Sequence, residues 1–195
     1  MLSTILKDYH LILASGSPRR QQFFKDLGLP FEIRLKPIDE IYPLHLKRAE
    51  ISDYLSKLKS EAFKGDLKKN EILITSDTIV WHQEKALGKP ADEAEAFKMI
   101  QSLSGGVHEV ITSVSFTTPQ NQITKHAITK VYFKELSSEE ILYYIKNFQP
   151  FDKAGGYGIQ EWIGYIGIHK IEGSYFNVMG LPLHLVYKTL IAMVS

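Results

Sequence analysis

The sequence predicts an α/β fold, in which helices flank a β-sheet. Strand and helix patterns alternate from the start of the chain, with an apolar strand over 11–14, an amphipathic helix over 19–27 and a second buried strand over 71–76. This alternation favours a layered α/β architecture over an all-helical or all-β one. The chain has 195 residues, 44% of them apolar, so it can bury a full hydrophobic core. Because no internal repeat or linker divides it, we expect one domain over 1–195.

The first helix carries clear start and stop signals. Ser17 is expected to cap it, and Pro18 suits the first helical position, where a missing N–H group costs nothing. Gly28 is the expected stop. We expect a short strand over 31–35 next, followed by a loop and a polar helix over 47–64.

The second buried strand is expected to deliver Asp77 and Thr78 at its carboxyl end, with 79–83 continuing in an extended form. Asp92 and Ser137 each precede a glutamate by three residues, which is the capping-box signal of a helix start. The remaining expected elements are a helix over 94–103, a hairpin of strands over 107–118 and 123–136, a helix over 138–148, a glycine-rich loop over 152–160, a strand over 164–171, an irregular segment over 172–182 and a closing helix.

Charge and cysteine content exclude several classes of protein. Lysine and arginine number 23 against 22 aspartates and glutamates, and a net charge of +1 argues against a long nucleic acid as the main partner. The chain has no cysteine, which excludes disulfides and thiolate chemistry. It shows no membrane-length apolar run, and its N-terminus is a poor signal peptide, so we expect a soluble, cytoplasmic protein.

A candidate anion site lies where the first strand runs into the first helix. The hydroxyls of Ser15 and Ser17, the guanidiniums of Arg19 and Arg20 and the free N–H groups of a helix start together describe a phosphate cradle. The alternative is a capped helix with exposed arginines. The spacing of a P-loop is absent.

Other candidate residues are individually weak. Asp77 could hold a divalent metal or activate water, or simply terminate its strand. Lys89, in a Gly-Lys-Pro turn, could meet a phosphate or remain solvated, and Glu40 belongs to an acidic pair that could serve a metal or water alone. Lys59 on the polar helix carries no signal by itself.

Two glycine-rich segments near the carboxyl terminus suggest a ligand site. Residues 152–160 and 172–182 combine glycines with aromatics and with the side chains of Gln160 and Asn177, which suits a flat ligand with hydrogen-bonding edges. Two ordinary turns are the alternative. The histidines form no close pair, so a histidine-ligated metal is unsupported.

Taken together, these segments resemble the Maf family, the septum-formation-inhibitor-like nucleoside triphosphate pyrophosphatases. The resemblance runs from Leu11 to Leu190 and consists of several ordered motifs, which are more specific together than any one alone. They are LILASGSPRRQQFF, Asp39-Glu40, LSKLKSEA with Lys59, ITSDTIV, LGKPADEAEAFKMIQSLSGGVHEVITSV, FDKAGGYGIQ and EGSYFNVMGLPL.

The resemblance implies an α/β fold like that of inosine triphosphatases, with an elongated mixed β-sheet flanked by helices and two lobes with a central cleft. Family members hydrolyse a nucleoside triphosphate to the monophosphate and pyrophosphate with a divalent metal, Mg²⁺ or Mn²⁺. The roles implied here are Asp77 as the proton acceptor that activates water, Glu40 with Asp77 at the metal, Ser15, Ser17, Arg19, Arg20, Lys59 and Lys89 around the phosphates, and Arg20, Thr78 and Gln160 as determinants of base preference.

The segment from Tyr157 to Gln160, YGIQ, is similar to the branch of the family that acts on dTTP and UTP, whereas the branch acting on 7-methylated GTP lacks it. Ser56, Ser60 and the pair Glu161-Trp162 depart from the family pattern. A homodimer, common among such folds, is left open. The alternative function is a nucleotide-binding cell-division regulator that needs no turnover, against which the intact Asp77, Lys59 and Lys89 argue.

Overall fold

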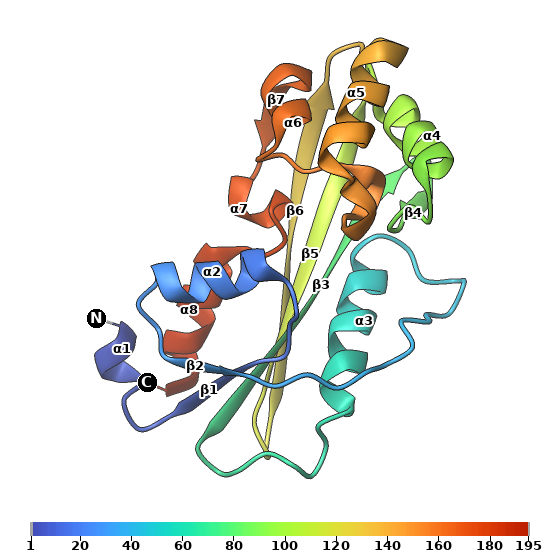
Figure 1. Cartoon of the computed structure of the whole chain (residues 1–195). Helices are drawn as coiled ribbons and strands as arrows, with labels where there is room; N and C mark the ends of the chain where they lie inside the picture. The colour runs from blue at the N-terminus through green and yellow to red at the C-terminus, as the bar shows by residue number, and fades with distance from the viewer. Residues whose placement is uncertain (1, 195) are drawn as a thin grey trace. The chain divides into compact units, whose positions relative to one another are not determined.

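The structure, a computed structural model, describes residues 2–194, which divide into two compact units (Figure 1). Unit 1 comprises the chain up to Asp77, residues 112–127 and the chain from Gly180 onward; unit 2 comprises residues 78–111 and 128–179. We expected a single domain over 1–195, and this expectation remains a prediction. The cleft implied by the family resemblance also remains a prediction.

Seven strands form a mixed sheet in the order β2-β1-β3-β5-β6-β7, with β4 paired to β3. β1 is parallel to β2 and to β3, whereas β4 is antiparallel to β3 and β7 is antiparallel to β6. This confirms the mixed α/β sheet. The strands are β1 (His10–Leu13), β2 (Phe31–Ile33), β3 (Glu71–His82), β4 (Lys85–Leu87), β5 (Val107–Thr117), β6 (Gln122–Phe133) and β7 (Ile168–Glu172).

Unit 1 contains the helices α1 (Leu2–Ile5), α2 (Pro18–Asp26), α3 (Ala49–Glu61) and α8 (Leu183–Val194), and α1 contacts α8 (Figure 1). α2 begins as predicted, with Pro18 as its first residue and the Ser17 side chain accepting a hydrogen bond from a backbone N–H group. Ile12 and Leu73 of the neighbouring strands β1 and β3 pack in the core with Phe63, which follows α3. These contacts fix the end of α3 against the parallel strands.

Unit 2 contains α4 (Glu93–Leu103), α5 (Ser138–Phe148), α6 (Trp162–Gly167) and α7 (Tyr175–Val178), with the short 3-10 helices η1 (Pro150–Asp152) and η2 (Ala154–Gly156). α4 contacts α5, and α5 contacts α6. The predicted capping box of α5 is present, because Ser137 and Glu140 accept each other's backbone N–H groups. The core includes Ile100, Val131 and Tyr144, all fully buried.

Two expectations are wrong. Asp77 does not stand at the end of a strand, because β3 continues through His82 and pairs with β4 across a turn in which Gln83 and Glu84 both have positive φ. Such a two-residue turn matches the twist of a hairpin. The strand expected over 164–171 begins only at Ile168, because 162–167 are helical; a short apolar run does not distinguish the two conformations.

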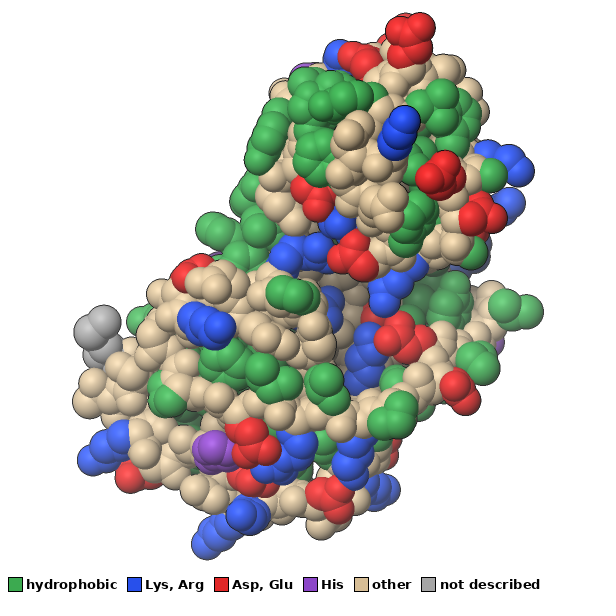
Figure 2. All heavy atoms as spheres, in the orientation of Figure 1, with side chains coloured by type: hydrophobic (Ala, Val, Ile, Leu, Met, Phe, Trp, Pro, Cys, Tyr) green, Lys and Arg blue, Asp and Glu red, His purple; other side chains and the backbone are tan. Residues whose placement is uncertain are grey.

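Acidic and basic side chains are interspersed over the visible face, without a broad region of one sign (Figure 2). This agrees with the net charge of +1. Within residues 2–194, no helix combines the length and apolar character that crossing a bilayer requires.

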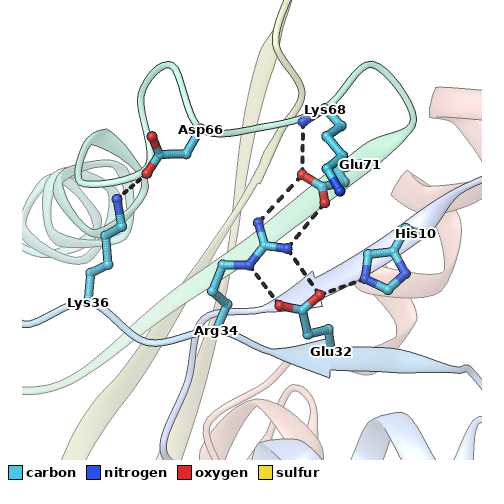
Figure 3. A network of polar contacts seen from close by, with 7 residues as sticks. All are labelled: His10, Glu32, Arg34, Lys36, Asp66, Lys68 and Glu71. Atoms are coloured by element: carbon cyan, nitrogen blue, oxygen red, sulfur yellow. Dashed lines mark hydrogen bonds and ion pairs between the residues drawn. The ribbon is translucent and has the colours of Figure 1, made fainter.

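A charged network ties together the parallel strands of unit 1 (Figure 3). Arg34, just beyond β2, binds Glu32 of β2 through Nε at 2.8 Å and Glu71 of β3 through Nη2 at 3.1 Å. The ring of His10 in β1 lies 2.8 Å from the second oxygen of Glu32, and the backbone N–H of Lys68 donates to Glu71 at 2.8 Å. The hydrogen bonds from Arg34 and His10 lower the pKa of Glu32 to about 2.

We predict that this network makes stability fall in acid. Folding lowers the pKa of Glu32 from its value in the unfolded chain, about 4.3 for glutamate, to about 2. The ionised carboxylate therefore stabilises the folded state at pH values above the unfolded pKa. This contribution is lost as the pH falls through the folded pKa. Glu32→Gln should therefore flatten the dependence of the urea unfolding midpoint on pH between about 5 and about 2. Glu61→Gln, at an exposed glutamate at the end of α3, is the control. Identical pH dependence in Glu32→Gln and wild type would contradict the prediction.

Candidate active site

The segment between β1 and α2 folds back on itself in unit 1. The N–H of Ser17 donates to Ser15 Oγ at 3.3 Å, and the N–H of Arg20 donates to Ser17 Oγ at 3.5 Å. Ser15 is buried, whereas Gly16 is exposed and has only one side-chain atom near the position of a Cβ. The predicted cradle is therefore a helix start whose hydroxyls already bind backbone N–H groups.

The Arg20 side chain points inward and binds two backbone carbonyls. Nε donates to Gly180 O at 2.8 Å, and Nη1 donates to Ser76 O at 2.9 Å. Burial lowers the pKa of this guanidinium, and the nearby Asp77 carboxylate opposes that shift. An arginine keeps its charge under these conditions, so Arg20 brings positive charge to the backbone immediately before Asp77. Arg19, one residue earlier on α2, is half-buried.

Two carboxylates converge on the ammonium of Lys59. Lys59 Nζ lies 2.7 Å from Asp77 Oδ1 and 3.1 Å from Glu40 Oε1. The Asp77 side chain is 8% exposed and that of Lys59 17%, whereas the Glu40 side chain is 47% exposed. The structure thus brings together four of the predicted residues. Arg20 and Lys59 lie near the buried Asp77, and Glu40 is the exposed member of the group.

Burial and neighbouring positive charges act in opposite directions on the pKa of the Asp77 carboxyl. Burial raises its pKa above the ordinary value, and the charge and hydrogen bond of Lys59 act in the opposite direction. A carboxylate whose pKa is raised by burial is a stronger base than a solvated one. Proton acceptance is therefore chemistry that this group can perform.

α3 is held in place by hydroxyl groups that sequence analysis did not assign. Ser52 Oγ lies 2.7 Å from Ser113 Oγ, and Ser56 Oγ lies 2.9 Å from Ser115 Oγ, so two serines of the helix pair with two of β5. Thr75 Oγ1 of β3 donates to Ser56 O at 2.7 Å. Since every one of these serines is buried, the hydroxyls fix both the height and the rotation of the helix that carries Lys59.

The other predicted residues belong to unit 2. Thr78 follows Asp77 in β3 and is half-buried, Lys89 is exposed just beyond β4, and Gln160 is half-buried before α6. The carbonyl of Gly88 accepts a hydrogen bond from Gly155 N at 2.9 Å, so the turn carrying Lys89 is anchored to the glycine-rich loop. Thr78 adjoins Asp77 along β3, whereas the proximity of Lys89 and Gln160 to the unit 1 residues remains a prediction.

The glycine-rich segments differ in their roles. Gly155 has a φ of +71°, and an added Cβ would lie 2.9 Å from a methyl group of Val80, so the loop packs closely on β3. Asn177 was expected to face a ligand, but it is buried and donates to Val110 O at 2.9 Å and to Thr129 Oγ1 at 3.0 Å. This side chain joins α7 to the sheet, because a buried amide must satisfy its donors within the protein.

Residues 2–194 contain no group of three or more histidines, aspartates and glutamates arranged to hold a metal. The pair Glu40 and Asp77 nevertheless already faces one cation, the Lys59 ammonium. Mg²⁺ binds through one or two carboxylates and completes its shell with water and substrate phosphates. Two hard oxygen donors on one positive charge therefore fit such an ion.

A family model described as "Maf-like protein" matches residues 10–193. A relative from Christiangramia forsetii named "dTTP/UTP pyrophosphatase" is 64% identical over all of both chains. Proteins with the same name from Flavobacterium johnsoniae and Bacteroides fragilis are 62% identical over all of both chains and 47% identical over 95% of this chain and 96% of the relative.

Among solved structures, the Staphylococcus aureus Ham1 protein matches with a TM-score of 0.51 at 14% identity, covering 94% of this chain and 99% of that one. This likeness concerns the fold alone, and it agrees with the mixed sheet flanked by helices. The family model spans nearly the whole chain, and the full-length relatives share about half or more of its residues. The chain therefore belongs to the Maf family.

Proposed function

We infer that the protein is a nucleoside triphosphate pyrophosphatase that acts on dTTP and UTP. The observation that carries this is the buried Asp77 carboxylate beside Lys59 and Arg20, in a chain whose full-length relatives bear the name dTTP/UTP pyrophosphatase. The YGIQ segment supports the same substrates. A cytoplasmic location suits a nucleotide substrate.

In the proposed reaction, water attacks the α-phosphorus of the nucleotide, the bond to the β-phosphate bridging oxygen breaks, and pyrophosphate leaves. Asp77 takes the proton from the attacking water, because burial has raised the affinity of its carboxylate for protons. Arg19, Arg20, Lys59 and Lys89 offset the negative charge of the triphosphate, with the hydroxyls of Ser15 and Ser17 and the N–H groups at the start of α2 as further donors.

Glu40 and Asp77 are the residues that would hold Mg²⁺ or Mn²⁺. When bound, such an ion supplies positive charge that neutralises charge developing on the phosphate oxygens. Without such an ion, the Lys59 ammonium neutralises both carboxylates. Base preference is determined in this proposal by Thr78, Gln160 and Arg20. The hydrogen bonds of Arg20 to two backbone carbonyls hold its guanidinium in one position.

We predict that Asp77→Asn lowers the rate of pyrophosphate release from UTP by about 10²- to 10⁴-fold, the range that a general base contributes. The measurement is coupled detection of pyrophosphate with Mg²⁺ present. Asp66→Asn, which neutralises an aspartate paired with Lys36 at the surface of unit 1, is the control and should keep wild-type activity. Full activity in Asp77→Asn would exclude the proposed role.

We predict that Glu40→Gln raises the Mg²⁺ concentration required for half-maximal activity by about tenfold, because it removes one charged ligand of the ion. Chelation with EDTA should abolish wild-type activity, and added Mg²⁺ or Mn²⁺ should restore it. Titrations of Glu40→Gln and Asp66→Asn with Mg²⁺ provide the comparison. Curves that coincide would remove Glu40 from the metal site.

We predict that Gln160→Ala lowers kcat/KM for UTP by about tenfold, the effect of losing hydrogen bonds to the base. The loss should lie mainly in KM, because the amide is assigned to binding and not to proton transfer. Gln101→Ala, at an exposed glutamine of α4 in the same unit, is the control. Unchanged kinetics in Gln160→Ala would show that Gln160 does not contact the base.

A further inference from the structure

Both carboxylate oxygens of Glu161 are engaged inside unit 2. Oε1 lies 3.0 Å from the ammonium of Lys153, and Oε2 accepts a hydrogen bond from the hydroxyl of Tyr144. Lys153 is 8% exposed and also binds Asp152 at 2.7 Å. Glu161 therefore joins α5, which carries Tyr144, to the glycine-rich loop, which carries Lys153.

This carboxylate is connected to the YGIQ segment through Tyr144. The N–H of Gly158 donates to the Tyr144 hydroxyl at 3.0 Å, and that hydroxyl in turn donates to Glu161. A Cβ at Gly158 would lie 2.8 Å from Glu161 Cδ and 3.1 Å from Lys153 Cε. Glycine thus allows the two charged side chains to lie directly against the backbone of the segment.

Gln160 lies inside the turn that these contacts close. The N–H of Glu161 donates to Gly158 O at 3.0 Å, and the carbonyl of Gln160 accepts a hydrogen bond from the Tyr165 hydroxyl at 2.5 Å. After the turn, the backbone of Gly164 packs against that of Ile159, whose carbonyl oxygen would lie 1.9 Å from a Cβ added at Gly164. Hydrogen bonds therefore hold the backbone around Gln160, and the side chain of Glu161 lies against Gly158 in the same turn.

We propose that Glu161 is a positioning residue that sets base discrimination by fixing the turn that presents Gln160. A glutamine amide carries one acceptor and two donors. It can pair with the carbonyl and N–H edge of uracil, and after a half-turn with the amino and ring-nitrogen edge of cytosine. Discrimination between the two is a difference in binding free energy, so it requires an amide whose position is fixed.

This inference rests on the proposed function, because it assigns Gln160 to the base. Glu161 belongs to unit 2, and its described contacts are with Tyr144 and Lys153, so in this proposal it acts through Gln160. Its loss should then change which nucleotide is accepted and leave the chemical step unchanged. A residue needed only for folding would instead lower the rates for all nucleotides together.

The test compares kcat and KM for UTP and CTP in wild type, Glu161→Gln, Tyr144→Phe and the double variant. Glu161→Gln keeps the size of the side chain and removes its charge. We expect the ratio of kcat/KM for UTP to that for CTP to fall about tenfold in each single variant, the effect of one hydrogen bond to a charged group. The change should lie in KM, with kcat for UTP within about twofold of wild type.

The double variant should show no larger change than either single variant, because both substitutions disrupt the same network of Lys153, Glu161 and Tyr144. Glu140→Gln is the matched control: it neutralises another lysine-paired glutamate on α5, and glutamine preserves the capping box. A wild-type UTP to CTP ratio in Glu161→Gln, or an equal loss of kcat for both nucleotides, would overturn the inference. Wild-type protein that hydrolysed neither nucleotide would overturn the proposed function itself, and the inference with it.

Discussion

Burial of the Asp77 carboxylate beside the Lys59 ammonium is the constraint on which the rest of the candidate site depends. Taking two charges out of water costs several kcal/mol for each ion, and their attraction offsets this only when the geometry is good. A buried pair is therefore weak evidence for stability. We infer that Asp77 is buried for its chemistry, because burial raises its pKa while the positive charges of Lys59 and Arg20 stabilise its ionised form.

The position of Lys59 depends on polar contacts made by serines that precede it in α3. The paired hydroxyls of Ser52 with Ser113 and of Ser56 with Ser115 hold α3 against β5 without apolar packing at those positions. Directional hydrogen bonds specify one rotation of a helix, whereas apolar contacts of similar area tolerate several. Ser56 thus contributes to the placement of the lysine that faces Asp77.

The sequence indicated the local signals well and the long-range ones poorly. Ser17, Pro18 and the capping box of Ser137 act within a few residues, so their patterns were sufficient. Asp77 was placed at a strand end, whereas 71–76 and the extended segment expected over 79–83 form one strand, β3, whose last residues pair with β4. Tertiary contacts also explain why the role of Asn177, which binds the carbonyl of Val110, was missed. Glu161 was missed for the same reason, because no sequence pattern links it to its partners Tyr144 and Lys153. The resemblance to a family supplied the residue roles that spacing alone left open.

In the proposed function, the protein cleaves its nucleotide between the α- and β-phosphates. The most direct test follows purified wild-type protein with UTP and Mg²⁺ over time by ³¹P NMR. We expect UTP to disappear while UMP and pyrophosphate accumulate in equal amounts, without UDP as an intermediate. Formation of UDP and inorganic phosphate, or unchanged UTP after prolonged incubation, would contradict it, and the second result would favour a regulator that binds nucleotide without turnover.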